Sequence, residues 1–321
     1  MRAVVVPAPG GPEVLAVSDA PAPEPGPGQL LVDVEVAGVN YIDTYQRSGL
    51  YPIPTPFVLG LEGCGTVAAT GPDVPGVAPG DRVAWASARG SYAEQVVLDA
   101  EQAVPVPEGL DPVLAGGSLL QGMTAHYLCS STVPVAEGDW VVVHAAAGGV
   151  GLLLTQLVKQ RGGRVLATTS TPEKAALAGD AGADEVATYE EFVAAARRLT
   201  GGAGVAAVFD GVGRATFDAG LEALRRRGTM VLYGAASGPV PPLDLQRLNA
   251  AGSLFTTRPK LGDYTASREE LLWRAGDVLA GLTSQALRLT IGGTYALADA
   301  RRAHEDLESR RTTGKLVLTV H

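Results

Sequence analysis

Cysteine is scarce in this chain of 321 residues, which contains only Cys64 and Cys129. Two cysteines cannot build a disulfide framework, and their spacing to each other and to the four histidines matches no metal site. We interpret both as small core residues. The scarcity argues against a disulfide-stabilised secreted domain and favours a reducing compartment, the cytoplasm.

Basic residues and long apolar runs are also in short supply. The chain has 25 Lys and Arg against 34 Asp and Glu, a net charge of −9, and no basic block. This balance argues against nucleic acid or an anionic membrane as the partner. The longest weakly polar stretch, VVVHAAAGGVGLLL, is too short and too interrupted to span a bilayer. A small-molecule partner is left, and an anionic cofactor would need local positive groups and backbone N–H donors.

Aromatic side chains make up only 5% of the sequence, yet three of its nine tyrosines fall in one short segment. The segment GVNYIDTYQRSGLY contains Tyr41, Tyr45 and Tyr51. A ring-lined wall for a flat substrate explains this cluster, and so does ordinary packing. Packing is the stronger explanation for Tyr41, which follows an apolar strand.

The distribution of proline and the apolar patterns divide the chain in two. Sixteen of the 22 prolines lie in residues 1–120, among short alternating apolar runs that predict a mostly-β, barrel-like domain. From Trp140 onward, about six apolar strands alternate with helix-length segments, which predicts a parallel sheet with crossover helices. We assign the C-terminal tail to the first domain, which gives residues 1–122 with 262–321, and 123–261. An independent C-terminal subdomain is the alternative.

A glycine loop follows the predicted strand WVVVHA and precedes an amphipathic helix. Its residues Gly148, Gly149, Val150 and Gly151 have the G-x-G-x-x-G spacing, with alanine at the first glycine. Such a loop lets a pyrophosphate approach the backbone at a helix N-terminus, and a simple turn is the alternative. In this strand, turn and helix context we predict a dinucleotide site.

The end of the next strand predicts which dinucleotide binds. An NAD site would have Asp or Glu there, whereas this chain has Thr168-Thr169-Ser170 and then Lys174. Small hydroxyls and a lysine at a helix start favour a 2′-phosphate, and therefore NADPH. The alternative is that Ser170, paired with Glu173, only caps the helix and that Lys174 is solvated.

Several motifs together resemble a known family. GVNYIDTYQRSGLYP, HAAAGGVG, GTMVLYG, LFTTRP and AHEDLESRRTTGK occur in the same order in the zinc-free quinone oxidoreductases of the medium-chain dehydrogenase/reductase superfamily. The resemblance covers nearly the whole chain. It implies an α/β protein with a GroES-like, mostly-β catalytic domain and a Rossmann domain with a doubly wound parallel sheet. It also implies a homodimer.

The resemblance also implies that no zinc is bound. Zinc-dependent members have a cysteine where this chain has Asn40, and a histidine where it has Leu61. Two cysteines cannot form the lobe that binds structural zinc either. Without a Lewis acid, alcohol oxidation is disfavoured and an acceptor that takes hydride readily is expected.

Site residues follow from the same resemblance. It places Asn40, Tyr45 and Tyr51 beside the nicotinamide, where they are predicted to be catalytic, and the first two are also predicted to contact the cofactor. The remaining predicted cofactor contacts are Lys174, Tyr189 and Arg310 at the adenosine phosphate, and Thr124 and Phe255 to Thr257 at the nicotinamide. Alternatively, Thr124 caps a helix and Arg310 only complements a helix end.

The predicted activity is direct hydride transfer from NADPH to a quinone, and the protons come from Tyr45, Tyr51 or solvent. Two alternatives stay open at this point. Relatives with similar loops reduce the activated double bonds of enones or acrylates. Other relatives serve as lens crystallins, so a non-catalytic NADPH-binding protein is the third reading.

Overall fold

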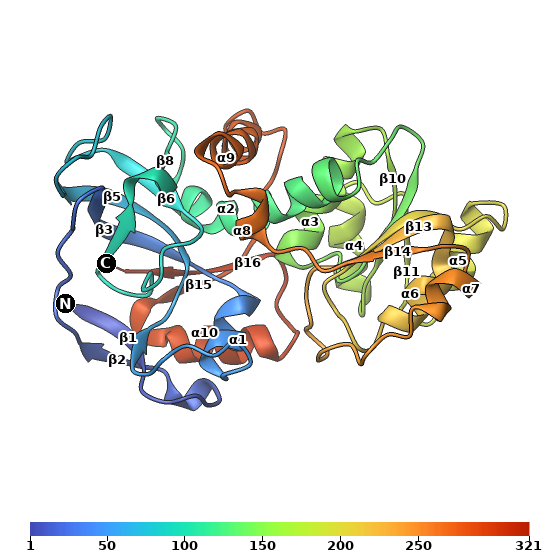
Figure 1. Cartoon of the computed structure of the whole chain (residues 1–321), viewed down its shortest axis with the longest axis horizontal. Coiled ribbons are helices and arrows are strands. Elements are labelled where there is room, and N and C mark those ends of the chain that lie inside the picture. Colours follow the sequence, from blue (N-terminus) through green and yellow to red (C-terminus); the bar gives the residue numbers. More distant parts are fainter. Residues whose placement is uncertain (321) are drawn as a thin grey trace. The chain divides into compact units, whose positions relative to one another are not determined.

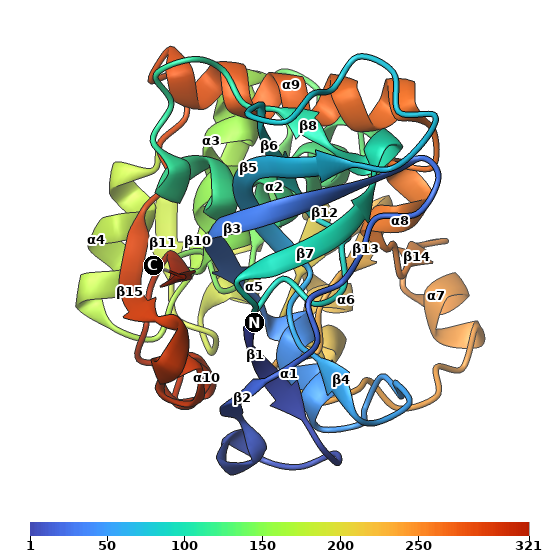
Figure 2. The ribbon, with the colours of Figure 1, turned by 90° about the vertical axis from the view of Figure 1, so that its left-hand side faces the viewer.

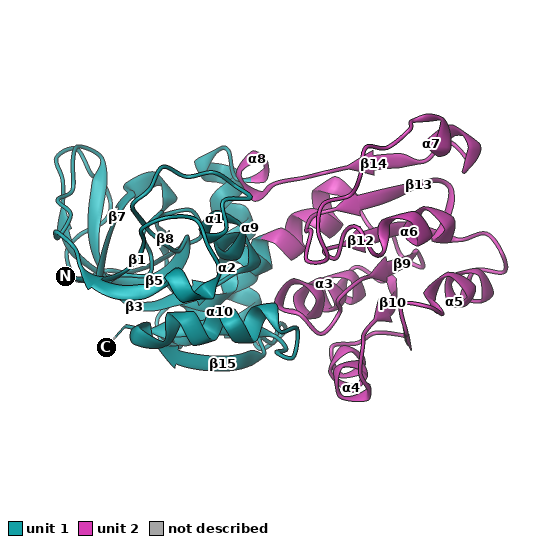
Figure 3. Ribbon diagram, turned by 90° about the horizontal axis from the view of Figure 1, so that it is seen from below, with its two compact units in different colours: residues 1–123, 265–321 teal, residues 124–264 magenta. Residues whose placement is uncertain are grey.

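A computed structural model describes residues 1–320 of the chain. The described chain forms two compact units (Figure 3), unit 1 with residues 1–123 and the described residues from 265 onward, and unit 2 with residues 124–264. The division predicted from the sequence lies close to both boundaries. That unit 1 is the catalytic domain and unit 2 the dinucleotide-binding domain stays a prediction at this stage.

Unit 1 is built mainly from short strands (Figure 1). Its strands are β1 (Arg2–Val6), β2 (Ala16–Asp19), β3 (Gln29–Val39), β4 (Phe57–Val58), β5 (Glu62–Thr70), β6 (Arg82–Trp85), β7 (Gln95–Asp99), β8 (Val104–Pro105), β15 (Ile291–Ala296) and β16 (Lys315–Thr319). Its helices are η1 (Pro12–Val14), α1 (Tyr41–Arg47), η2 (Ala100–Gln102), α9 (Arg268–Thr283), η4 (Leu297–Asp299) and α10 (Ala300–Glu308). Helix α2 (Pro112–Tyr127) starts in unit 1 and crosses the boundary.

The long strand β3 organises unit 1. It pairs antiparallel with β5, β7 and β16 in a seven-stranded sheet, and Figure 2 shows it beside β5 and β7. Its first half alternates buried and more exposed residues, as its sequence pattern requires, and the residues after Val36 are all buried. Because β16 comes from the tail and pairs with β3, the tail belongs to the same sheet as the N-terminal strands.

Unit 2 contains one parallel sheet with helices in its connections. Its elements are η3 (Leu128–Thr132), β9 (Trp140–Val143), α3 (Gly149–Gln160), β10 (Arg164–Thr168), α4 (Pro172–Asp180), β11 (Glu185–Ala187), α5 (Phe192–Leu199), β12 (Val205–Asp210), α6 (Phe217–Ala223), β13 (Leu224–Leu232), α7 (Gln246–Ala250), β14 (Phe255–Thr257) and α8 (Leu261–Tyr264). The strand order is β11-β10-β9-β12-β13-β14, and every pair is parallel. This is the doubly wound order of a Rossmann domain, so the predicted fold class is confirmed.

The alternative that Ser170 caps the following helix is wrong. The N-cap of α4 is Thr171, whose hydroxyl accepts the Lys174 N–H at 3.3 Å, and not Ser170. With Pro172 as the first helical residue, the side chain directly before it is the one in position to cap.

Among the helices of residues 1–320, none is both long and apolar enough to cross a bilayer.

Candidate active site

Helix α1 carries the tyrosine cluster of unit 1. The chain leaves β3 at Val39, and Asn40 has the extended backbone of an N-cap residue. The Asp43 carboxylate accepts the Asn40 backbone N–H at 2.8 Å, which is one half of a capping box. This short segment therefore turns directly from a buried strand into a helix.

The Tyr45 ring lies near both other rings of this segment. Its centroid is 5.4 Å from that of Tyr51, edge to face, and 6.3 Å from that of Tyr41, and Tyr51 is 40% exposed. The Tyr51 N–H donates to the Tyr45 carbonyl at 3.0 Å, which ties the loop back to the helix. The Tyr41 hydroxyl instead donates to the Leu307 carbonyl on α10 at 3.1 Å. The geometry gives Tyr41 a packing role and leaves the Tyr45–Tyr51 pair as a candidate substrate wall.

Asn40 is buried, with 2% of its surface exposed, and its amide group is committed within unit 1. Its Oδ1 accepts from the Lys315 ammonium at 2.8 Å. Its Nδ2 donates to Glu62 Oε2 at 2.9 Å and to the Gly38 carbonyl at 3.2 Å. The predicted contacts of Asn40 with substrate and cofactor stay predictions, and a positioning role is the one that its bonds support.

The residues around Asn40 do not fit a zinc ion. Its amide oxygen and the Glu62 carboxylate both bind the Lys315 ammonium, a cation that would repel a metal ion at the same place. Within residues 1–320, no three His, Cys, Asp or Glu side chains gather in a group that could hold a metal.

A buried acid, Asp43, lies beside this group. Its Oδ2 accepts from the Tyr92 hydroxyl at 2.9 Å as well as from the Asn40 N–H, whereas its Oδ1 has no hydrogen-bond partner among residues 1–320. Burial raises the pKa of Asp43 to about 7, although both hydrogen bonds and the Lys315 charge act in the opposite direction. Sequence reasoning missed Glu62, Lys315 and Asp43 as members of one network. The only local signal was a lysine heading the apolar strand KLVLTV.

The glycine loop of unit 2 connects β9 to α3 as predicted. Gly148 is the N-cap of α3, and Gly149, Val150 and Gly151 form its first turn, whose N–H groups have no acceptor inside the helix. A Cβ at Gly151 would lie 2.5 Å from the Ala145 carbonyl oxygen. Only glycine therefore lets the helix approach the loop this closely, and the loop geometry fits a bound pyrophosphate.

Two of the predicted adenosine contacts, Ser170 and Lys174, follow the carboxyl end of the neighbouring strand β10. Ser170 is exposed just outside α4, and Lys174 is half-buried in its first turn. The Tyr189 hydroxyl accepts the Ala145 N–H at 3.2 Å, so this side chain reaches the start of the glycine loop. Thr168 is buried and its hydroxyl bonds the His144 ring at 2.8 Å, which makes it part of the core. Ser170 and Lys174 thus flank a strand end that carries no acid, which fits NADPH.

The other predicted cofactor contacts are dispersed. Thr124 is 8% exposed and lies inside α2, so the alternative that it caps a helix is wrong. Phe255 is 60% exposed on the edge strand β14, and Thr257 ends that strand. Arg310 is exposed in unit 1, just after α10. Their roles at the cofactor stay predictions.

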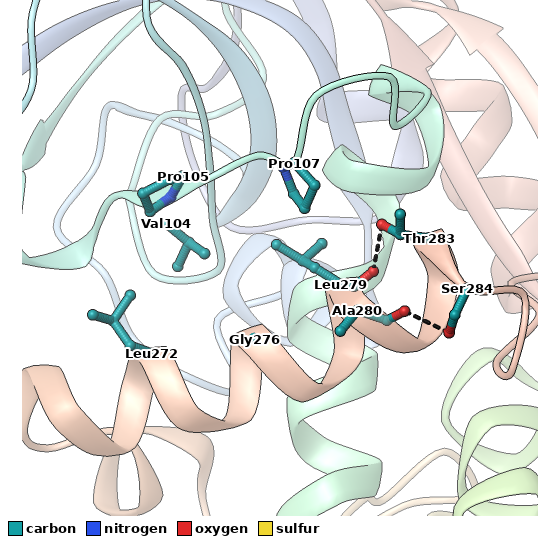
Figure 4. A pocket seen from close by; sticks show the side chains of 9 residues that line it. All are labelled: Val104, Pro105, Pro107, Leu272, Gly276, Leu279, Ala280, Thr283 and Ser284. Carbon is teal, nitrogen blue, oxygen red and sulfur yellow. Dashed lines mark hydrogen bonds between the residues drawn. The ribbon is translucent and has the colours of Figure 1, made fainter.

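An apolar groove elsewhere in unit 1 lacks groups for this chemistry. It encloses about 470 Å³ between the β8 segment and α9 (Figure 4), and it is lined by Val104, Pro105, Pro107, Leu272, Gly276, Leu279, Ala280, Thr283 and Ser284. Its two hydroxyls donate to carbonyls of their own helix, Thr283 to Leu279 at 2.9 Å and Ser284 to Ala280 at 2.7 Å. We therefore do not count the groove as part of the site.

Models of known protein families match parts of both halves of the chain. A model of the alcohol dehydrogenase GroES-like domain matches residues 26–108, and a model of zinc-binding dehydrogenases matches residues 149–268. The quinone oxidoreductase of Pseudomonas aeruginosa is 43% identical over 313 residues, which cover 96% of each chain. More distantly, the 2-haloacrylate reductase of a Burkholderia species is 35% identical and covers 99% of this chain and 98% of its own.

Solved structures agree with these matches. A mycobacterial protein in complex with NADPH has a TM-score of 0.97 at 52% identity, and 100% of both chains is covered. The Escherichia coli quinone oxidoreductase, also complexed with NADPH, has a TM-score of 0.97 at 38% identity with the same coverage. The chain belongs to the quinone oxidoreductase branch of the medium-chain dehydrogenase/reductase superfamily.

Proposed function

We propose that this enzyme reduces quinones with NADPH and uses no zinc. The observation that carries the proposal is the ring pair of Tyr45 on α1 and Tyr51, 40% exposed, in the loop after it. The N-cap of this helix, Asn40, is held by the buried Lys315 ammonium. A planar acceptor stacks well on such rings, and phenol hydroxyls bond its oxygens. Relatives named as quinone oxidoreductases and solved with NADPH support the same reading.

The residues of unit 2 bind the cofactor in this proposal. The first-turn N–H groups of Gly149, Val150 and Gly151 hold the pyrophosphate at the positive end of α3. Ser170 and Lys174 bind the 2′-phosphate at the end of β10, and Tyr189 borders the same pocket. When bound, NADPH supplies the hydride.

The residues of unit 1 hold the acceptor. The Tyr45 and Tyr51 rings orient the quinone, and reduction to the hydroquinone consumes one proton in addition to the hydride. Tyr45, Tyr51 and solvent are the candidate sources of that proton. Zinc has no part in this scheme, since the donor groups at Asn40 and Glu62 are occupied by Lys315.

The first experiment measures the loss of reduced-nicotinamide absorbance with purified, metal-stripped protein. NADPH and NADH are compared, each with a set of quinones and a set of enones. We expect turnover with NADPH and quinones. No turnover with any acceptor, despite measurable NADPH binding, would overturn the proposal in favour of a binding protein.

The tyrosine wall is tested in the same assay. Replacing both Tyr45 and Tyr51 by phenylalanine removes two hydroxyls, and each lost hydrogen bond costs about 1 kcal/mol, or about fivefold. We expect kcat/KM for quinones to fall by about tenfold or more. Tyr41→Phe is the matched control, because its hydroxyl bonds Leu307. An unchanged kcat/KM in the double variant would refute the proposal that Tyr45 and Tyr51 bind the quinone through their hydroxyls.

Reduction of an activated carbon–carbon double bond is the second candidate. The observation that favours it is the similarity to a 2-haloacrylate reductase at 35% identity. The same ring pair and the same hydride donor would serve an α,β-unsaturated carbonyl compound. Turnover restricted to the enone set in the acceptor comparison would move the assignment to this reaction.

We also propose a cytoplasmic homodimer. The edge strand β14 of unit 2 leaves one side of its backbone unpaired in the sheet, and it carries the exposed Phe255. Leu245, 69% exposed, lies in the segment before it. Joining this edge to that of a second copy would cover both side chains. The cytoplasm is favoured by two cysteines that are both free and buried.

A further inference from the structure

A buried ion pair lies at the root of α1. The Lys315 ammonium contacts Glu62 Oε2 at 2.5 Å and Asn40 Oδ1 at 2.8 Å. Neither charged side chain has any exposed surface. Full burial of both charges is unusual, because removing each from water costs several kcal/mol.

The pair is well satisfied by its surroundings. Glu62 Oε1 accepts the Leu120 N–H of α2 at 2.7 Å, and Oε2 also accepts from Asn40 Nδ2 at 2.9 Å. These bonds connect the end of β3, the start of β5, the start of β16 and the middle of α2. We call these three side chains, Asn40, Glu62 and Lys315, the buried triad.

The backbone makes room for the triad. A Cβ at Gly38 would lie 2.9 Å from Lys315 Nζ and 2.8 Å from Glu62 Cδ. A Cβ at Gly117 on α2 would lie 3.2 Å from Lys315 Cγ. Two glycines on different elements thus leave the space that the charged side chains fill, which is the packing expected of a built feature.

The buried triad contributes to fixing the position of α1, a helix that needs tertiary contacts to be stable. With seven residues, α1 is far too short to be stable in isolation. Its N-cap is Asn40, whose side chain is bound by Lys315 and Glu62. Its later part carries Tyr45. The other end of α1 has its own anchor, since Arg47 binds Glu308 at 2.8 Å and His304 Nδ1 at 3.0 Å. A shift of Asn40 would therefore move the start of the helix and change the orientation of Tyr45.

An ion pair of this kind is seldom the most stable choice. Well-packed apolar side chains in the same space would often stabilise the fold equally well or better. The charged pair adds orientational specificity, because its hydrogen bonds fix one orientation of the Asn40 amide. We propose that Lys315 and Glu62 are positioning residues, which fix α1 through Asn40 and thereby set the geometry of the acceptor wall. The inference rests on the proposed function for its effect on the acceptor, and not for its effect on α1.

The test uses Lys315→Met and the double variant Glu62→Gln with Lys315→Met. The single variant leaves the Glu62 carboxylate buried without its cation. The double variant leaves no unpaired buried charge, and it serves as the test if the single variant does not fold. Arg274→Met is the matched control, since Arg274 is a cation of the same unit that is 1% exposed and paired with Glu270 at 3.5 Å. Two readouts are taken, namely steady-state kinetics with a quinone and hydrogen exchange of the peptide that covers residues 40–51.

In the triad variants we expect kcat/KM for the quinone to fall by about tenfold to a hundredfold, as for other small misplacements of a site. NADPH affinity, measured by titration without an acceptor, should change less than about threefold, a shift below 1 kcal/mol. Exchange over 40–51 should be faster than in wild type. Arg274→Met should leave the exchange and the quinone KM unchanged.

A double-mutant cycle separates positioning from general damage. Lys315→Met is combined with Tyr45→Ala and Tyr51→Ala, and if the triad acts through the wall its effect on kcat/KM should largely vanish in that background. The inference would be overturned if Lys315→Met lowered kcat/KM by the same factor with and without the tyrosine substitutions. It would also be overturned if hydrogen exchange over residues 40–51 in the triad variants equalled that of wild type. If the wild-type enzyme reduces no quinone, the proposed function fails, while the exchange experiment still tests the control of α1.

Discussion

At the residue scale, Asp43 is the most unusual group of the site. It is fully buried, one of its oxygens has no hydrogen-bond partner within residues 1–320, and burial raises its pKa to about 7. The titratable and charged groups around it are Tyr92, Glu62 and Lys315. In an unfolded chain its pKa would be about 3.9. Between these two values the folded protein holds a proton that the unfolded chain has lost.

This difference predicts how stability depends on pH. Because the folded state binds more protons in this window, the Asp43 contribution favours folding below about pH 4 and is lost as the pH rises through about 7, by a few kcal/mol. Asp43→Asn removes the contribution. We expect the free energy of unfolding of the variant, relative to that of wild type, to be higher at pH 8 than at pH 5, as measured by urea unfolding. The same difference at both pH values would contradict this.

Two buried histidines act in the opposite direction. Burial lowers the pKa of His144 and His304 to about 3. Both stay neutral in the fold while the unfolded chain gains protons below about pH 6.5, so their contribution is lost as the pH falls toward 3. The comparison of Asp43→Asn with wild type at each pH cancels this common background.

At the element scale, the start of α4 separates two roles that adjoin in sequence. Thr171 caps the helix, whereas Ser170 lies outside it with its side chain exposed. Thr171→Ala should lower the free energy of unfolding by about 1 kcal/mol. Ser170→Ala should leave stability unchanged and weaken NADPH binding several-fold, with NADH binding unaffected. These outcomes are measured by thermal unfolding and by titration with each cofactor.

The opposite pattern would change the assignment. If Ser170→Ala lowered stability and left the preference for NADPH intact, Ser170 would be the cap in solution. The phosphate site would then depend on the other predicted contacts, Lys174, Tyr189 and Arg310.

At the scale of the whole molecule, the exposed edge of the parallel sheet predicts self-association. Phe255 was predicted from the sequence to contact the cofactor, and it lies on β14 with 60% of its surface exposed. Phe255→Lys places a charge on this edge and should give a monomer by sedimentation. Trp273→Lys is the control, since Trp273 is 47% exposed on α9. A variant that stays dimeric but binds NADPH more weakly would assign Phe255 to the cofactor instead.

The sequence by itself determined the parts that depend on local pattern. The apolar runs and glycine signals between Trp140 and Thr257 predict six strands in the observed order of the chain. The loop glycines and the missing acid after β10 predict the cofactor, because close backbone approach and charge are encoded within a few residues. The tyrosine segment predicts an acceptor site at α1, and this stays a prediction.

Only the tertiary structure decided which distant residues meet. Glu62 and Lys315 are separated by 253 positions, and their pairing depends on β16 joining β3, which no local pattern specifies. The burial that raises the pKa of Asp43 likewise comes from elements far away in the chain. Strand and turn signals act over a few residues, whereas burial and ion pairing arise when the whole unit packs. The positions of charges in the site were therefore beyond the sequence pattern, and the fold and cofactor class were within it.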